Sequence, residues 1–449
     1  LGLGSCGESF FEQYPSNNIT EGNFYKTDDD FNQGVVACYA KLKTQMSFHL
    51  TEIGYRGDEN VLESMAVSTQ NRYDIDHFAE TANNGILNDI WNAWYNGIYR
   101  CNDVLDHMTG AKIANYDKYR GECLFLRSWW YFNLYRVFGV VPITRTVVTP
   151  AAAKLIPRCT EEEMYTLLTE DLAEAARLLP PTPGPEKARV ANIAAYTLLA
   201  KVYLTFGKPA EAKTALEEAM KNTSYGLEST TKKVFDVGNK MNREIIFALY
   251  YNKTNDNGHG YWYSANTDVL ADINNPTPTF KAIYDSEKDN RLPLISSYTK
   301  IKDNLFAMTK WYDTYDATYT TQVGNDFPHL RYADVVLMYA EALAESGGSL
   351  GDALEWLNKT RTRAGLDELT TDEVKSLAEF RRELAAERGR EFALEGHRWF
   401  DLVRLGLAVD YFREMGYSLD SHNLIFPIPQ NQIEIVNNPS ILWQNPGFN

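Results

Sequence analysis

The chain has 449 residues, of which 44% are hydrophobic and 13% aromatic, and its acidic residues outnumber its basic residues by 60 to 44. The net charge of −16 excludes binding driven by attraction to nucleic acid or to anionic headgroups. No stretch reaches the roughly 20 apolar residues of a membrane-spanning helix. The length suits two or three ordinary domains or one large one. The 28 Tyr and 9 Trp suit either a flat, half-apolar ligand or large helix interfaces.

The chain begins with a short motif that is typical of lipid-anchored bacterial proteins. Leu3–Cys6, LGSC, has the lipobox order of an aliphatic residue, two small residues and a cysteine, and a polar tether follows it. We therefore expect residues 1–5 to be the remnant of a signal peptide. Acyl chains such as palmitate on Cys6 would then hold a soluble body at a membrane surface.

Helical periodicity dominates the N-terminal part. Three segments show it, from about Asp30 to Met46, from Ile86 to Met108 and from Tyr116 to Gly139. A fourth helix is predicted by Thr160, which is followed three residues later by Glu163, since this spacing forms a capping box.

Two of the cysteines lie equally far from the turn near Lys112, which joins two predicted antiparallel helices. These are Cys101 and Cys123. They could form a disulfide in an oxidising envelope, or they could be small residues at close helix contacts. The sequence leaves both alternatives open.

Two later segments match the tetratricopeptide hairpin, a pair of helices with large and small residues at fixed positions. The first runs from Ala188 to Tyr225 with Gly207 at its turn, and the second runs from Arg331 to Ala364 with one residue inserted in its turn. They predict a helical scaffold assembled from distant parts of the chain. The matching positions are Tyr196, Leu199, Ala200, Tyr203, Ala212, Leu216 and Ala219, then Val336, Tyr339, Ala340, Leu343, Ala353, Leu357 and Thr360.

Between the repeats, from about Ser224 to Pro328, the chain is rich in Asn, Asp, Thr, Gly and Tyr. Its short apolar runs, such as EIIFALYY, predict strands. Long irregular segments on a rigid frame commonly carry binding residues. Asp285–Ser296 begins with alternating oxygen ligands but lacks the Gly and Glu that an EF-hand needs. We assign no metal and no cofactor.

The segment EFALEGHRWFDLVRLG, Glu391 to Gly406, reads as one helix that is packed on two sides and has two polar seams. Two nearby carboxylates are what a glycosidase uses. Neighbouring arginines, however, lower a carboxyl pKa, whereas a general acid must keep its proton. No second His or Cys lies at metal-ligand spacing. We therefore interpret the segment as scaffold. One seam holds Glu391, Glu395 and Arg398, and the other holds His397, Asp401 and Arg404.

Four motifs closely resemble signature blocks of the SusD/RagB family and occur in the family's order. They are GECLFLRSWWYFNLYRVFGVVPI with Arg127 and Pro142, LRYADVVLMYAEAL with Arg331 and Glu341, RGREFALEGHRWFDLVRLG, and NLIFPIPQNQIEIVNNPSILWQNPGFN at the C-terminus. The resemblance implies a mostly helical SusD-like fold, with tetratricopeptide pairs as scaffold and long irregular loops with a few short strands. We expect a single domain over residues 6–449. Its parts would be an N-terminal part (6–150), a helical-repeat scaffold (160–223 and 328–364 with 371–406) and a loop-rich ligand-binding insertion (224–327).

The resemblance also implies a function. Members of this family are lipid-anchored outer-membrane nutrient-binding proteins of Bacteroidetes-type bacteria, which cap a SusC-like TonB-dependent transporter and usually capture glycans. Because the family reuses the pattern of the second helix for packing, Trp91 and Trp94 are expected in the core. Our first hypothesis is a non-catalytic protein, anchored at the cell surface through Cys6, that binds oligosaccharide and passes it to the transporter.

The family motifs do not locate the ligand site, because the binding loops differ between members. Sugar rings pack their C–H faces on aromatic side chains and pair their hydroxyls with polar groups. We expect ligand contacts in three stretches that combine the two. These are YYNKTNDNGHGYWYSANTD with Tyr261, Trp262, Tyr263 and Asn266, KWYDTYDATYT with Trp311 and Tyr312, and EIGYRGDENV with Tyr55, Arg56 and Asp58.

Two other hypotheses come from different classes of protein. A helical-repeat adaptor would bind peptide in a concave repeat face that stays open, and a carrier could take peptide in place of glycan. An enzyme is disfavoured, because the chain has no H-E-x-x-H motif and no carboxylate pair free of neighbouring arginines.

Overall fold

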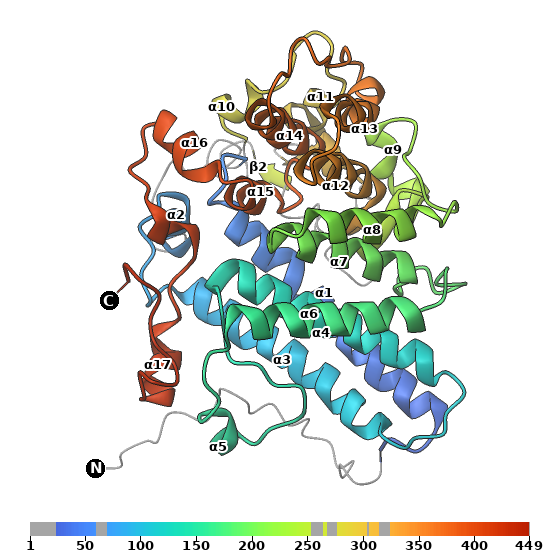
Figure 1. Cartoon of the computed structure of the whole chain (residues 1–449), viewed down its shortest axis with the longest axis vertical. Helices are drawn as coiled ribbons and strands as arrows, with labels where there is room; N and C mark the ends of the chain where they lie inside the picture. Colours follow the sequence, from blue (N-terminus) through green and yellow to red (C-terminus); the bar gives the residue numbers. More distant parts are fainter. Residues whose placement is uncertain are drawn as a thin grey trace. The chain divides into compact units, whose positions relative to one another are not determined.

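The structure, a computed structural model, is mostly helical with a few short strands, as the sequence predicts (Figure 1). It describes residues 24–59, 70–252, 264–266, 276–302, 305–313 and 324–448. The chain divides into two compact units. The first holds residues 1–45, 80–178 and 425–449, and the second holds residues 46–79 and 179–424. None of the described helices combines the length and the apolar character of a membrane span.

The first unit is built on long helices. Its α4 packs against both α3 and α6, and α17 packs against α3 (Figure 1). The predicted bounds of α3 and α4 hold to within one residue, whereas the first helix continues past the predicted Met46. The elements are α1 (Asp28–Gly54, to Gln45 in this unit), α3 (Gly85–Met108), α4 (Tyr116–Phe138), α5 (Pro150–Ala153), α6 (Glu161–Leu178) and α17 (Gln430–Val436).

The core of the first unit confirms the packing role of Trp91 and Trp94, which are both 0% exposed. Cys101 and Cys123 are free thiols and fully buried, so they serve as small residues at helix contacts. The thiol of Cys38, also buried, donates to the backbone carbonyl of Gly34 at 3.4 Å.

The predicted capping box at the start of α6 is confirmed. The backbone amide of Thr160 donates to Glu163 Oε2 at 2.7 Å, and the amide of Glu163 donates to Thr160 Oγ1 at 3.2 Å. Two otherwise unpaired N–H groups are satisfied in this way.

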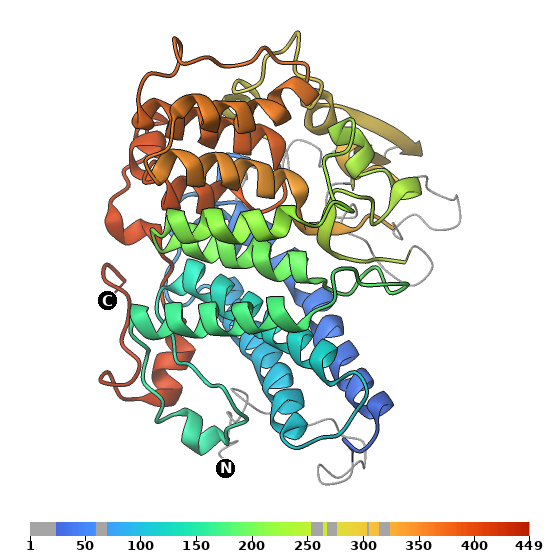
Figure 2. The same cartoon turned by 45° about the vertical axis from the view of Figure 1, so that its right-hand side comes forward.

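Both predicted tetratricopeptide hairpins are present in the second unit, where α12 packs against α8, α13 and α14 (Figure 2). Gly207 has a φ of +67° at the first turn, a backbone conformation that favours glycine. The small residues Ala212, Ala340 and Ala353 are fully buried, as expected where helices touch. The helices are α7 (Asn192–Thr205), α8 (Pro209–Met220), α12 (Tyr332–Glu345), α13 (Leu350–Arg363) and α14 (Leu377–Glu391).

Two small antiparallel sheets stand in the segment between the repeats. The predicted strand in EIIFALYY is β1, which pairs with β5 from Ile245↔Arg331 to Leu249↔Phe327. The other sheet has the order β2-β4-β3. The strands are β1 (Ile245–Leu249), β2 (Ser264–Asn266), β3 (Tyr298–Lys302), β4 (Leu305–Met308) and β5 (Phe327–Arg331).

Short helices complete the second unit, and those of them that lie between the repeats were not predicted. They are α2 (Gln70–Asp76), α9 (Thr231–Val234), η2 (Val237–Asn239), α10 (Pro278–Lys281), α11 (Leu292–Ser296), η4 (Thr309–Trp311), α15 (Arg398–Arg404), α16 (Ala408–Glu414) and η5 (Ser421–Leu424).

The segment Glu391–Gly406 is not the single helix that its periodicity predicts. Helix α14 ends at Glu391 and α15 begins at Arg398. Between them Leu394 and Gly396 have φ values of +63° and +75°, which no α-helix contains. A Cβ on Gly396 would lie 3.3 Å from the Cβ of Leu50, so the break also allows a close approach of two chain segments.

Candidate functional site

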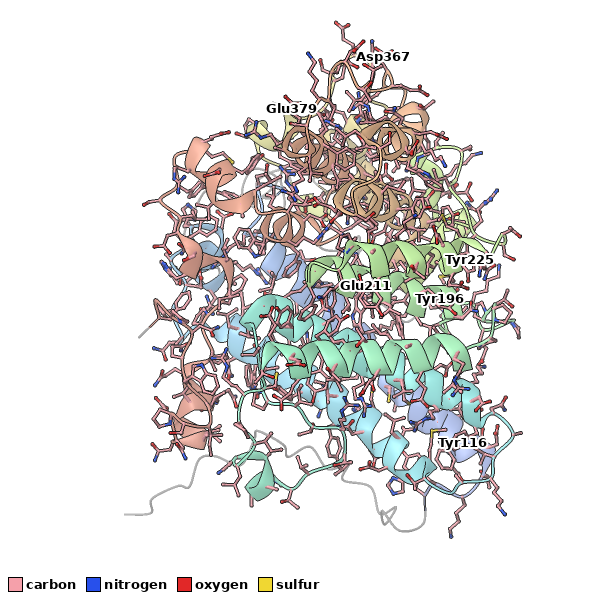
Figure 3. All side chains as sticks on the ribbon, viewed as in Figure 1. Tyr116, Tyr196, Glu211, Tyr225, Asp367 and Glu379 are labelled. Atoms are coloured by element: carbon pink, nitrogen blue, oxygen red, sulfur yellow. The ribbon has the colours of Figure 1, made fainter. Side chains whose placement is uncertain are left out.

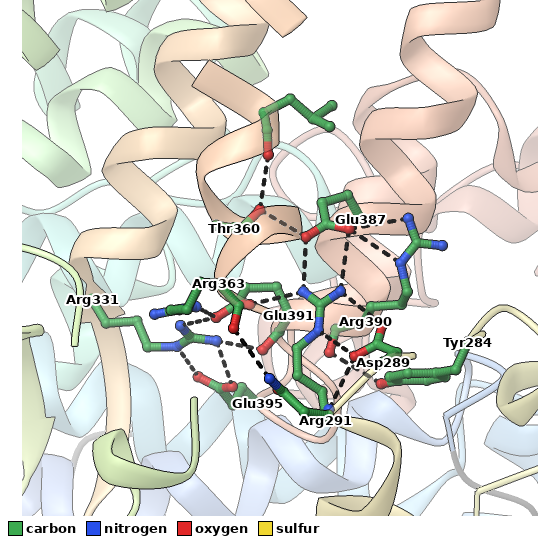
Figure 4. Close-up of polar contacts among 12 residues, drawn as sticks. Tyr284, Asp289, Arg291, Arg331, Thr360, Arg363, Glu387, Arg390, Glu391 and Glu395 are labelled. Carbon is green, nitrogen blue, oxygen red and sulfur yellow. Dashed lines mark hydrogen bonds and ion pairs between the residues drawn. The ribbon is translucent and has the colours of Figure 1, made fainter. Parts of the chain in front are cut away.

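The acidic residues at the end of α14 meet arginines from distant parts of the second unit (Figure 4). Glu391 accepts hydrogen bonds from Arg291 Nη1 at 2.9 Å and from Arg331 Nη1 at 2.6 Å, and it also pairs with Arg363. Glu395 accepts from Arg331 Nε at 2.8 Å. The most exposed of these side chains is that of Arg363, at 5%. The arginine–carboxylate cluster is therefore internal.

Further carboxylates balance the same arginines. Glu387 accepts from Arg291 Nη1 at 2.8 Å, and Asp289 accepts from Arg291 Nε at 2.9 Å. Glu244, which precedes β1, accepts from Arg331 Nη1 at 2.8 Å. The cluster thus joins the start of β1, the end of β5, α11, α13 and α14 in one network.

The charges of this cluster exclude Glu391 as a general acid. Burial alone would raise the pKa of Glu391, but Arg363, Arg331 and Arg291 hold that pKa well below its usual range. A carboxyl that stays ionised cannot donate the proton that glycosidic cleavage needs. The interpretation of this segment as scaffold is the one that the geometry supports.

The second predicted seam belongs to another buried network. Asp401 accepts from Arg404 Nε at 2.9 Å, as the spacing predicts, and from Arg388 Nε at 2.7 Å. His397 faces Lys201, whose Nζ lies 3.5 Å from its Nδ1. Burial and then the charge of Lys201 lower the pKa of His397.

Arg398 does not pair with the glutamates of its predicted seam. Its Nε donates to Asp58 Oδ1 at 2.9 Å instead. The prediction is wrong because Arg398 starts a new helix after the break, whereas the seam assumed a continuous one.

The run Gly347–Gly351, GGSLG, has the form of the nucleophile motif of hydrolases. That motif needs a strand before the serine, but here it forms the turn between α12 and α13. Ser349 is the N-cap of α13, and its Oγ accepts from Gly351 N at 3.1 Å. The serine therefore has a structural role.

Among the described residues, no group of three or more His, Cys, Asp or Glu side chains is arranged to hold a metal ion. In the stretch Asp285–Ser296, Asp285 accepts from the backbone amides of Glu287 and Lys288, and the carboxylate of Asp289 is taken by Arg291.

The first predicted ligand stretch falls largely outside the described residues. The residues outside are Tyr261, Trp262 and Tyr263. Asn266 is described and ends β2, where its backbone lies opposite that of Leu305 in β4. Tyr312 follows η4 directly and is half-buried.

The prediction that Trp311 contacts a ligand is wrong for the packing in this structure. Trp311 is 1% exposed. Its ring lies edge-on to Phe235, with centroids 5.1 Å apart, and 6.2 Å from the ring of Phe327. A stacking residue must present a face to the sugar, and this ring is covered by other parts of the chain.

The third predicted stretch is also core. Tyr55, Arg56 and Asp58 are at most 2% exposed. The guanidinium of Arg56 lies 5.3 Å from the ring of Trp399, and Asp58 is the partner of Arg398. The polar composition of this loop reflects internal pairing, so its predicted ligand contacts are wrong.

Comparison with known proteins finds SusD-type family models in both the N-terminal and the C-terminal part of the chain. The SusD family model matches residues 290–448. A second model, described as starch-binding associating with outer membrane, matches residues 14–204. The SusD-like protein P2 of Formosa agariphila is 26% identical and covers 98% of this chain and 97% of its own length.

Solved structures agree on the fold. A SusD-like protein from Bacteroides fragilis has a TM-score of 0.81 at 22% identity and covers 97% of this chain and 100% of its own. Surface glycan-binding protein A from Bacteroides thetaiotaomicron, in complex with laminarihexaose, has a TM-score of 0.76 at 22% identity and covers 94% of this chain and 100% of its own.

The fold and the internal charge clusters define a helical-repeat scaffold protein with small accessory sheets. The chain belongs to the SusD/RagB family.

Proposed function

We propose that the protein is a non-catalytic cell-surface glycan-binding lipoprotein that captures oligosaccharide and delivers it to a SusC-like TonB-dependent transporter. The observation that carries this proposal is the match of residues 14–204 to a family described as starch-binding and associated with the outer membrane. The laminarihexaose complex of a structure similar over 94% of the chain supports the glycan class of ligand.

The site that we propose for the glycan is the stretch with Tyr261, Trp262, Tyr263 and Asn266, together with Tyr312. Sheet register supports this grouping. Ser264, the residue directly after Tyr263, pairs with Ala307 of β4, and β4 leads through η4 to Tyr312. Two stretches that combine aromatic and polar residues are thus attached to paired strands. Trp311, Tyr55, Arg56 and Asp58 are no longer part of the proposed site.

The proposal of a non-catalytic role is supported by the buried carboxylates of the scaffold, which pair with arginines. The carboxylates of Glu387 and Glu391 are held ionised by arginines. A carrier must also release its cargo, so we expect modest affinity. Anchoring beside the transporter raises the effective concentration in compensation.

Cys6 lies outside the described residues, and its lipobox context supports the lipid anchor. In cells that make the Cys6→Ala variant, we expect the protein to lose fatty-acid labelling and to leave the membrane fraction. The SusC-like transporter should co-purify with the anchored protein from detergent-solubilised outer membranes.

A gel-retardation assay tests the glycan function. The chain that begins after Cys6 is run through native gels that contain single polysaccharides, and each polysaccharide is also incubated with the protein and analysed for products. We expect retardation by one class of glycan and no products. Released oligosaccharides would contradict the non-catalytic role, and retardation by none of the glycans, with binding of a peptide mixture, would make peptide the cargo.

A further inference from the structure

A hollow of about 410 Å³ opens in the second unit, where the chain that leaves α8 passes α12 and α13. This volume is in the range of small-ligand sites. Tyr225, Tyr332 and Trp356 line it, and all three are half-buried (Tyr225 is labelled in Figure 3). The hollow thus offers aromatic surface that the core does not use.

Two cations line the same hollow, Arg243 and Lys359. Neither forms an ion pair with any carboxylate in the part of the chain that the structure describes. The charge of Glu355 acts on Lys359, but the two side chains are not paired. In a protein with 60 acidic and 44 basic residues, two cations in one hollow that form no ion pair with the described carboxylates stand apart from the neutralised clusters.

Packing holds the aromatic and cationic groups in place. Lys359 Nζ lies 3.1 Å from the centroid of the Trp356 ring. The ring of Tyr339 packs edge-on against Trp356 at 4.6 Å, and the Tyr339 hydroxyl donates to Glu217 Oε1 at 3.1 Å. The indole is therefore held between α12 and the hollow, with an ammonium group beside its face.

Gly226 makes room for the second cation. Its backbone amide donates to the carbonyl of Arg243 at 3.0 Å. A Cβ on Gly226 would lie 2.2 Å from Arg243 Nη2, so the guanidinium group occupies the space that any other residue would fill.

We propose that this hollow binds an anionic sugar residue that carries a carboxylate or a sulfate group. Aromatic side chains pack on the C–H face of a sugar ring, and guanidinium and ammonium groups make charge-assisted hydrogen bonds to carboxylate and sulfate oxygens. The inference rests on the proposed glycan-binding function and adds a ligand class and a second site, apart from the stretch with Trp262.

Calorimetric titration of the chain that begins after Cys6 tests this inference. The probes are trigalacturonate, the neutral galactotriose, galactose 6-sulfate and free galactose. We expect trigalacturonate to bind about tenfold more tightly than galactotriose. This preference should shrink as salt rises from about 0.05 to about 0.5 M, because salt screens exposed charges. The two monosaccharides show whether sulfate replaces carboxylate.

The variants Arg243→Gln and Lys359→Gln should each remove most of the preference, and Trp356→Ala should weaken both trisaccharides. Arg382→Gln is the matched control, because Arg382 is an exposed cation on α14 that forms no ion pair with the described residues and lies outside the hollow. Its affinities should equal those of the wild type. Thermal melting of each variant checks that it is folded.

Equal affinity for trigalacturonate and galactotriose would overturn the inference, as would a preference that survives both cation variants. Equal binding of pentaglutamate would overturn it too, since the hollow would then recognise charge alone. If a neutral glycan binds and only Trp262→Ala abolishes its binding, the inference fails while the proposed function stands. If no glycan binds at all, both fail.

Discussion

Arg331 holds Glu395 through two hydrogen bonds, from Nε to Oε2 at 2.8 Å and from Nη2 to Oε1 at 3.1 Å. The pair joins the last residue of β5 to the break between α14 and α15, and both side chains are at most 1% exposed. A buried ion pair of this kind can fix how two chain segments pack together. Removal of one partner strongly lowers stability, because the other charge is left buried and unpaired.

The Glu395→Ala variant should therefore be strongly destabilised. It would leave the ammonium group of Lys310, which is buried and otherwise bonded to the carbonyl of Ala393, without its carboxylate. We expect the free energy of unfolding to fall by about 3 to 5 kcal/mol, measured by urea denaturation. The control is Asp410→Ala, which breaks an exposed ion pair with Arg413. This change should alter the free energy of unfolding by at most about 1 kcal/mol. Similar losses in the two variants would contradict this account.

Glu59 should make stability depend on pH. Burial, helped by the charge of Asp58, raises the pKa of Glu59 to about 8, while Arg398 and Lys310 oppose the shift. Between the ordinary pKa of 4.5 and about 8, the unfolded carboxyl is ionised and the folded one keeps its proton. The contribution of Glu59 to stability therefore falls as pH rises through this window.

The Glu59→Gln variant removes this titration. We expect its free energy of unfolding, relative to the wild type, to rise between about pH 5 and about pH 8 by up to about 1.4 kcal/mol per pH unit. Urea denaturation of both proteins at several pH values measures the difference. A difference that does not change with pH would show that Glu59 is ionised in the folded protein.

Gly97 of α3 should not accept even a methyl group. A Cβ there would lie 2.2 Å from Cε2 of Trp130, which is 0% exposed and has no space to move into. We expect Gly97→Ala to destabilise the protein by about 1 to 3 kcal/mol, although alanine favours helices. Combining it with Trp130→Phe should cost less than the sum of the two single changes, because the smaller ring makes room. Additive losses would contradict the proposed clash.

Local sequence patterns predicted much of the scaffold. The bounds of α3 and α4, the capping box at Thr160 and both tetratricopeptide hairpins follow from spacings within one turn or one hairpin. Such signals depend on neighbours in sequence, so they hold without knowledge of the tertiary structure.

Contacts between distant segments could not be predicted in this way. The break at Leu394 lets Glu395 pair with Arg331, which lies 64 positions earlier in the chain. Helical periodicity predicted Arg398 as the partner of Glu395 instead. Trp311 and Arg56 lie in polar stretches, and nothing local shows that other segments bury them. The lining of the hollow could not be predicted either. Trp356 lies within a tetratricopeptide repeat, where the pattern predicts packing between helices and gives no sign of a ligand site.

The central claim is that the protein binds glycan through the stretch with Trp262. Isothermal titration calorimetry with a glycan selected by gel retardation tests it most directly, with the wild type, Trp262→Ala, Trp311→Ala and Trp443→Ala compared. Trp443 is 40% exposed and lies outside the proposed site, so it is the matched control.

We predict that Trp262→Ala keeps the melting temperature of the wild type and loses at least about tenfold in affinity, as expected for an aromatic residue at the centre of a site. Trp311→Ala should lose about 3 to 5 kcal/mol of stability, because it empties a packed core. Trp443→Ala should bind as the wild type does. Wild-type affinity in folded Trp262→Ala, or an equal loss in Trp443→Ala, would contradict the claim.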